Sequence, residues 1–79
     1  MSSTATDPAL MPPASWRARR AALISHGAEL DDARVVECDE ALAYWRVRRV
    51  LDAERGSIAA RDVPALADML KHAHPAVPA

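Results

Sequence analysis

The chain has 79 residues, a formal net charge of −1 and 51% hydrophobic residues. This length allows one domain at most, and the near-zero charge argues against bulk electrostatic attraction to nucleic acid or to an anionic membrane. Cys38 is the single cysteine, which excludes an intramolecular disulfide and favours a reducing compartment. The first residues lack the basic and apolar regions of a secretory signal, and no apolar run approaches the ~18 residues of a transmembrane helix. We therefore expect a cytoplasmic protein that does not span a membrane.

Both ends of the chain are predicted to be disordered tails. Residues 1–14 are rich in Ser, Thr, Ala and Pro and include the Pro12-Pro13 pair, and residues 75–79 are similar. Such segments have little apolar surface to bury, and proline interrupts a helix. Residues 15–74 are then left to form one three-helix domain. Their alanine-rich, glycine-poor composition predicts an all-α fold.

The first helix is predicted to run from Ser15 to His26. The Ser15 hydroxyl is a suitable N-cap, and Gly27 supplies the left-handed residue that commonly ends a helix. The connection over 27–30 is short, which favours an antiparallel helical hairpin with the next helix.

A long central helix is predicted from Asp31 to Arg55, with Asp31 as its N-cap and Gly56 at its end. Its apolar residues form two adjacent stripes along the helix. Together these stripes are wider than the ~100° that one packed neighbour covers. We therefore expect the central helix to touch more than one partner. The first stripe contains Val35, Cys38, Leu42 and Trp45, and the second contains Val36, Ala43, Val47, Val50 and Leu51.

A shorter third helix is predicted from Val63 to Ala73. Asp62 is a plausible N-cap, and Pro64 stands in the first turn, where its missing N–H has no consequence. The apolar face of this helix consists of Leu66, Met69, Leu70 and Ala73.

Few side chains suit catalysis or metal binding. Cys38 lies on an apolar stripe, so we expect a small core residue and not a nucleophile. Asp68, His72 and His74 are too few for a structural zinc site, which needs four ligands. With only two glycines the chain has no phosphate-cradling loop. We predict a non-enzymatic protein with no catalytic residue, metal or cofactor.

Two arginine clusters each follow a tryptophan, and arginine beside aromatic residues can contact phosphates and stack on bases. Arg48 and Arg49 have an acidic neighbour, Asp52, at helical spacing in their own helix. The arginines of the first cluster have none. They are therefore the candidates for nucleic-acid contact, and the alternative interpretation is a solvated face. These candidates are Arg17, Arg19 and Arg20.

Asp39 and Arg46 interrupt the apolar arc of the central helix, where a charge is costly unless it has a partner. Either both side chains extend from the edge of the core to water, or two copies of the helix pack antiparallel so that Asp39 of one meets Arg46 of the other. The second arrangement predicts a homo-oligomer. We thus expect a protein–protein interaction module, a homodimer or an adaptor for another protein, with nucleic-acid contact as the alternative. The predicted interface is Val35, Cys38, Asp39, Leu42, Trp45, Arg46, Val47 and Val50.

The segment from Trp16 to Leu70 has four features in a fixed order. They are residues 17–23, the Asp31-Asp32 pair, the basic central helix and Pro64-Ala65-Leu66. In these features the chain resembles a group of short helical proteins of high-GC Gram-positive bacteria, often associated with phage or integrated elements. The resemblance implies an accessory role in mobile-element biology. The group carries no assigned activity that would transfer to this chain.

Overall fold

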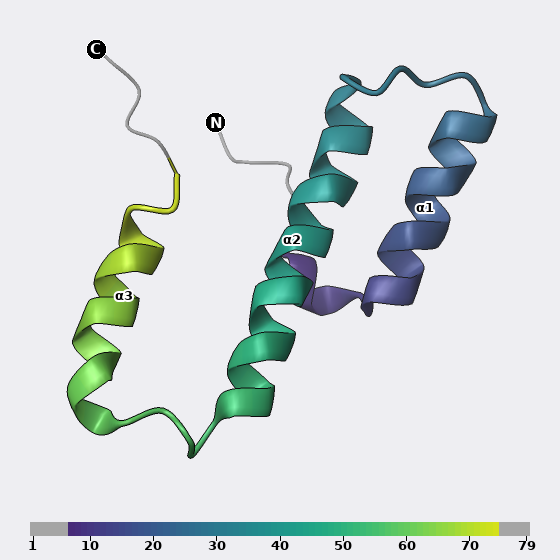
Figure 1. Ribbon diagram of the computed structural model, residues 1–79. Coiled ribbons are helices and arrows are strands. Elements are labelled where there is room, and N and C mark those ends of the chain that lie inside the picture. Colours follow the sequence, from purple (N-terminus) through teal and green to yellow (C-terminus); the bar gives the residue numbers. More distant parts are fainter. Residues whose placement is uncertain (1–6, 75–79) are drawn as a thin grey trace, which may run out of the picture.

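The computed structural model describes residues 7–74, which form helices and no strand. The α-helices are α1 (Pro13–Ser25), α2 (Ala33–Glu54) and α3 (Val63–Lys71), and two short 3-10 helices are η1 (Pro8–Leu10) and η2 (Ala60–Asp62). In Figure 1, α1 and α2 form an antiparallel hairpin and α3 stands on the other side of α2. The prediction of an all-α fold with a long central helix and a short third helix is confirmed.

Helix α1 begins two residues earlier than predicted. Pro12 is its N-cap and Pro13 occupies the first turn, where a proline has no hydrogen bond to lose. The backbone N–H of Ser15 donates to the Pro12 carbonyl at 3.0 Å, so Ser15 already lies inside the helix. The prediction of a Ser15 cap was therefore wrong.

Gly27 ends α1 as predicted. Its φ of +96° lies in the left-handed region that favours glycine. The Gly27 N–H donates to the Ile24 carbonyl at 3.0 Å, and the Ala28 N–H donates to the Leu23 carbonyl at 2.9 Å. These two bonds satisfy carbonyls of the last turn and form a Schellman motif. The chain thereby reverses toward α2 within a few residues.

Asp32, and not the predicted Asp31, is the N-cap of α2. Its carboxylate accepts from the Arg34 backbone N–H at 2.8 Å and from the Arg34 guanidinium at 2.9 and 3.0 Å. The hydrogen bond from the Arg34 side chain has the largest effect on the pKa of Asp32, followed by that from the Arg34 backbone N–H. Together they lower this pKa to about 2. Both ends of α2 thus fall within two residues of the predicted bounds, and Gly56 follows with φ +86°.

The core of the hairpin is small and lies between α1 and α2. Trp16 from α1 and Val35 and Cys38 from α2 are fully buried, and Ala41 is nearly so. The side chains packed against the Trp16 cluster are partly buried, namely Met11, Leu23, Leu42 and Trp45.

One backbone carbonyl connects the N-terminal segment to both helices of the hairpin. The Pro8 oxygen accepts from the Trp16 indole Nε1–H at 3.0 Å and from the Trp45 indole Nε1–H at 2.8 Å. Asp7 caps η1 by accepting from the Ala9 N–H at 2.9 Å. Residues 7–14 are therefore ordered, and the prediction that they belong to a disordered tail was wrong.

The physical reason for this difference is that burial of apolar side chains is not the only interaction that orders a segment. The segment supplies instead a hydrogen-bond acceptor for two indoles that would otherwise have their N–H groups unpaired in a half-buried site. The remaining residues of the two predicted tails, 1–6 and 75–79, lie outside the described residues.

Helix α3 begins after Asp62, with Pro64 in its first turn as predicted, although the Asp62 side chain makes no cap hydrogen bond. It ends at Lys71, two residues before the predicted Ala73. None of its residues is buried, and within the described residues it packs only on η2. The three-helix domain is thus a two-helix hairpin with a third helix held at a distance.

Replacing the indoles tests the shared Pro8 carbonyl. Trp16→Phe or Trp45→Phe alone leaves this oxygen one donor, so each loses about 1 kcal/mol of hydrogen-bond stabilisation in addition to packing. The double variant leaves the oxygen with no indole donor, and its loss of unfolding free energy should exceed the sum of the single losses by about 1 kcal/mol.

Urea denaturation followed by circular dichroism measures these losses. Tyr44→Phe is the control, because the Tyr44 hydroxyl only accepts an exposed bond from Arg48. Strict additivity of the two tryptophan substitutions would contradict a shared acceptor.

The Asp32 cap predicts an acid-dependent loss of stability. Because folding lowers the pKa of Asp32 from its usual 3.8 to about 2, its ionised form stabilises the fold above about pH 4. This contribution should disappear as the pH falls from about 4 through 2. The measurement is the difference in unfolding free energy between the protein and Asp32→Asn, which still caps but does not titrate. A difference that is constant from pH 7 to pH 2 would contradict the prediction.

Candidate functional site

The first apolar stripe of α2 serves the interior of the hairpin. Val35 and Cys38 have no exposed surface, and Leu42 and Trp45 pack against the Trp16 cluster. Val35 and Cys38 were predicted as part of an interface with a partner. That part of the prediction was wrong, because both side chains are already fully buried within the chain.

The second apolar stripe of α2 is left open by α1. Val47 and Val50 are 47% and 61% exposed, and Val36 and Leu51 are also exposed. The prediction that α2 has more apolar surface than one neighbour covers therefore agrees with the structure. Val47 and Val50 are the residues of the predicted interface that are exposed on this second stripe.

A groove runs between this stripe and α3. It encloses a cavity of about 520 Å³ whose apolar walls come from Tyr44, Val47 and Leu51 of α2 and from Leu70 of α3. Leu70 is 57% exposed, and its neighbours Leu66 and Met69 are exposed as well. Charged residues of α2 and its C-cap also line the cavity: Glu40, Arg48, Asp52 and Arg55. Apolar walls with a charged margin are typical of protein–protein interfaces.

Asp39 and two of the candidate arginines form ion pairs across the hairpin. The Arg20 Nε lies 2.6 Å from an Asp39 oxygen, and Arg19 Nη2 lies 3.7 Å from a Glu37 oxygen. Arg19 also stands over the Trp16 ring at 5.8 Å. Asp39 thus has its partner within its own chain, and the reason to expect a contact with Arg46 of a second copy is removed.

The same ion pairs correct the prediction for Arg19 and Arg20 as free phosphate ligands. That prediction depended on the absence of acidic residues at helical spacing within the same helix. Glu37 and Asp39 belong instead to the other helix of the hairpin. Arg17 has no ion pair or hydrogen bond with any described residue. It is the one member of the predicted nucleic-acid set that is available to an external anion.

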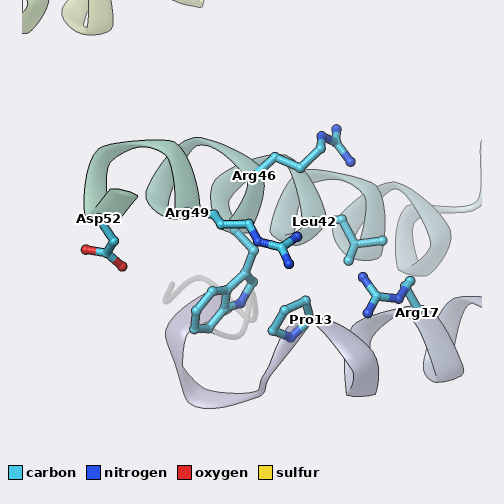
Figure 2. A pocket seen from close by; sticks show the side chains of 7 residues that line it. Pro13, Arg17, Leu42, Arg46, Arg49 and Asp52 are labelled. Atoms are coloured by element: carbon cyan, nitrogen blue, oxygen red, sulfur yellow. The ribbon is translucent and has the colours of Figure 1, made fainter. Parts of the chain in front are cut away.

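Arg17 lies beside a second cavity, of about 490 Å³, between the start of α1 and the second half of α2. Figure 2 shows the Arg17 and Arg49 guanidinium groups reaching toward the same space from the two helices, with Pro13 and Leu42 beside them. Arg46 and Trp45 also line this cavity. Sequence reasoning did not single out this group. The predicted antiparallel hairpin could have indicated it, because this arrangement brings the first turn of α1 beside the second arginine cluster.

Arg48 is held differently from its neighbours. It lies 3.8 Å from an Asp52 oxygen, donates to the Tyr44 hydroxyl at 3.1 Å, and stands 4.8 Å from the centre of the Trp45 ring. Asp52 also accepts from Arg55 at 2.8 Å. The Asp52 carboxylate lies at the end of the arginine-lined cavity. It already pairs with Arg48 and Arg55, which do not line that cavity.

Other chemistry has little support in residues 7–74. No three His, Cys, Asp or Glu side chains of this part of the chain gather to hold a metal ion. Asp68 and His72 are both exposed, and His72 Nδ1 lies 3.6 Å from an Asp68 oxygen. No third ligand from the described residues joins them. Cys38 is a core residue as predicted, and burial raises the pKa of its thiol. The described helices include none that is long and apolar enough to cross a bilayer.

Comparison with protein-family models, with curated proteins and with solved structures finds no match to this chain. The resemblance to short helical proteins of mobile elements therefore stays a prediction. The α2–α3 groove and the arginine-lined cavity are the two surfaces of the described residues that can accept another molecule.

The burial of Cys38 predicts slow reaction with thiol reagents. The thiolate is the reactive form, and the raised pKa together with the absence of exposed surface suppresses it in the folded protein. At pH 8 the labelling rate with a disulfide reagent should fall at least about a hundredfold below that of the urea-unfolded chain. Comparable rates in the two states would place Cys38 on an accessible surface and contradict its core position.

Proposed function

We propose that the chain is a non-enzymatic protein–protein interaction module that acts as a homodimer, with the α2–α3 groove as the interface. The observation that carries this proposal is the state of α3. This helix has nine residues, none of them buried, and it packs only on η2 within the described residues. An isolated helix shorter than ~12 residues is marginal in water, so α3 gains its stability from an additional contact.

The distribution of apolar surface supports the same proposal. Among residues 7–74, eleven large apolar side chains are exposed, and nine of them belong to α2 or α3, five and four respectively. Exposed apolar surface that is contiguous and bordered by charge marks an interaction site in a soluble protein. Burying these nine side chains in each copy would cover an area on the order of the ~800 Å² per partner found in standard interfaces.

The occupant we propose is a second copy of this chain. The α2 stripe and the α3 face are the two halves of a helix–helix contact, yet a cavity of about 520 Å³ separates them in one chain. In a two-fold dimer, α3 of each copy enters the groove of the other, and every contact occurs twice. The surface is thus self-complementary, which an adaptor for an unrelated protein would not require.

The alternative function, nucleic-acid contact through Arg17, Arg19 and Arg20, has less support. Two of these arginines are engaged with Glu37 and Asp39, so an external phosphate would compete for them with carboxylates of the same chain. We therefore place the homodimer first.

Charge placed in the groove tests the homodimer. Val47→Glu and Leu70→Glu each bury an unpaired carboxylate in the proposed interface, and we expect each to weaken dimerisation by at least about tenfold. Analytical ultracentrifugation over a range of concentrations measures the dissociation constant. The wild-type chain should sediment with twice the monomer mass, and the variants should shift toward the monomer at the same concentration.

The matched control is Leu30→Glu. Leu30 is 68% exposed in the α1–α2 connection, outside the groove, so its substitution adds the same charge without touching the interface. Circular dichroism confirms that each variant keeps the hairpin. A wild-type chain that stays monomeric at millimolar concentration overturns the proposal, as does equal weakening by the control.

A further inference from the structure

We propose that the cavity between the start of α1 and the second half of α2 binds a terminal phosphate group attached to a flat or apolar group, as in a nucleoside monophosphate. This inference does not depend on the homodimer, because Arg17, Arg46 and Arg49 do not line the α2–α3 groove. It rests on the pairing of the arginines, the shape of the cavity and the nature of its floor.

The arginines of the described residues fall into two groups, those that have an ion pair with a carboxylate and those that have none. Five of them have ion pairs with carboxylates, and the four without one are Arg17, Arg46, Arg49 and Arg61. Three of these four line the same cavity. In Figure 2 the Arg46 guanidinium is directed away from this space, so Arg17 and Arg49 are the uncompensated arginines that converge there.

Guanidinium groups that share a space repel one another unless an anion lies between them. Figure 2 shows Arg17 and Arg49 directed toward one region from opposite helices, while Asp52 lies at the far end of the cavity. Asp52 is also engaged with Arg48 and Arg55, so it does not neutralise this region. An external anion would remove the repulsion and accept several charge-assisted hydrogen bonds.

The charge and size of the cavity favour a phosphate over a carboxylate. A phosphate monoester carries about −1.5 to −2 charges and three acceptor oxygens at neutral pH, which matches two converging guanidinium forks. The cavity volume of about 490 Å³ falls in the range of small-molecule sites. It is larger than one phosphate needs, so the attached group has room.

The floor of the cavity defines that attached group. Pro13, Leu42 and Trp45 supply apolar surface beside the arginines. A base or another flat group fits such a floor, because apolar surface and arginine planes both accept a stacked ring. A free nucleotide and the 5′-phosphorylated end of a nucleic-acid strand present the same chemistry and are two sources of one ligand.

Titration with adenosine 5′-monophosphate, followed by NMR of backbone and indole N–H groups of ¹⁵N-labelled full chain, tests the proposal. We expect saturable shifts at Arg17, Leu42 and Arg49. Arg17→Gln and Arg49→Gln should each weaken binding about tenfold or more, since each removes charge-assisted hydrogen bonds. Arg61→Gln is the matched control, because Arg61 is also exposed and unpaired among the described residues but lies in η2, and it should leave binding unchanged.

Further probes separate the sources and the competing outcomes. A 5′-phosphorylated oligothymidylate that binds more tightly than the mononucleotide identifies a strand end as the source, and the reverse order identifies a free nucleotide. The proposal is overturned if adenosine binds as well as its monophosphate, or if the unphosphorylated strand binds as well as the phosphorylated one. It is also overturned if a polyglutamate peptide binds more tightly than either phosphate ligand, or if neither phosphate ligand shifts the cavity residues.

Discussion

The fold of this protein depends on how two tryptophans are accommodated in a core of very few side chains. Trp16 is fully buried and Trp45 packs against it, and each needs an acceptor for its indole N–H. The Pro8 carbonyl provides both hydrogen bonds. One short segment before the hairpin thereby joins the start of α1 to the middle of α2. This constraint places the first turn of α1 beside the second arginine cluster, and the arginine-lined cavity follows from it.

The same constraint explains why α2 has surface to spare. The hairpin uses only the stripe that faces Trp16, because α1 is a single short helix on one side of α2. The adjacent stripe, with Val47 and Leu51, stays exposed and faces α3 across a groove. A small chain without disulfides has few internal means to stabilise such a helix. Association with a second copy adds apolar burial without enlarging the chain, which is consistent with the homodimer that we propose.

The three arginines of α1 differ in their charged surroundings. Arg19 and Arg20 hold α1 against α2 through Glu37 and Asp39, so these charges act in the structure of the hairpin. Arg17, three residues before Arg20 in the same helix, projects toward the space that Arg49 also enters. Neighbouring arginines of one sequence cluster therefore serve different purposes. The distinction depends on the helix face that each occupies and on the acidic residues that the opposite helix brings within reach.

The amino-acid sequence alone determined the helical class, the order and approximate bounds of the helices, the left-handed glycine after α1, and the excess apolar surface of α2. These properties are local, because they depend on propensity, capping and the 3.6-residue period. Only the tertiary structure decided which stripe α1 covers, that Val35 and Cys38 are interior, and that Asp39 pairs with Arg20. It also decided that the Pro8 carbonyl accepts from both indoles and that Arg17 and Arg49 line one cavity. Each of these depends on residues far apart in the chain, and the helical period of one segment carries no information about which distant side chain completes a contact.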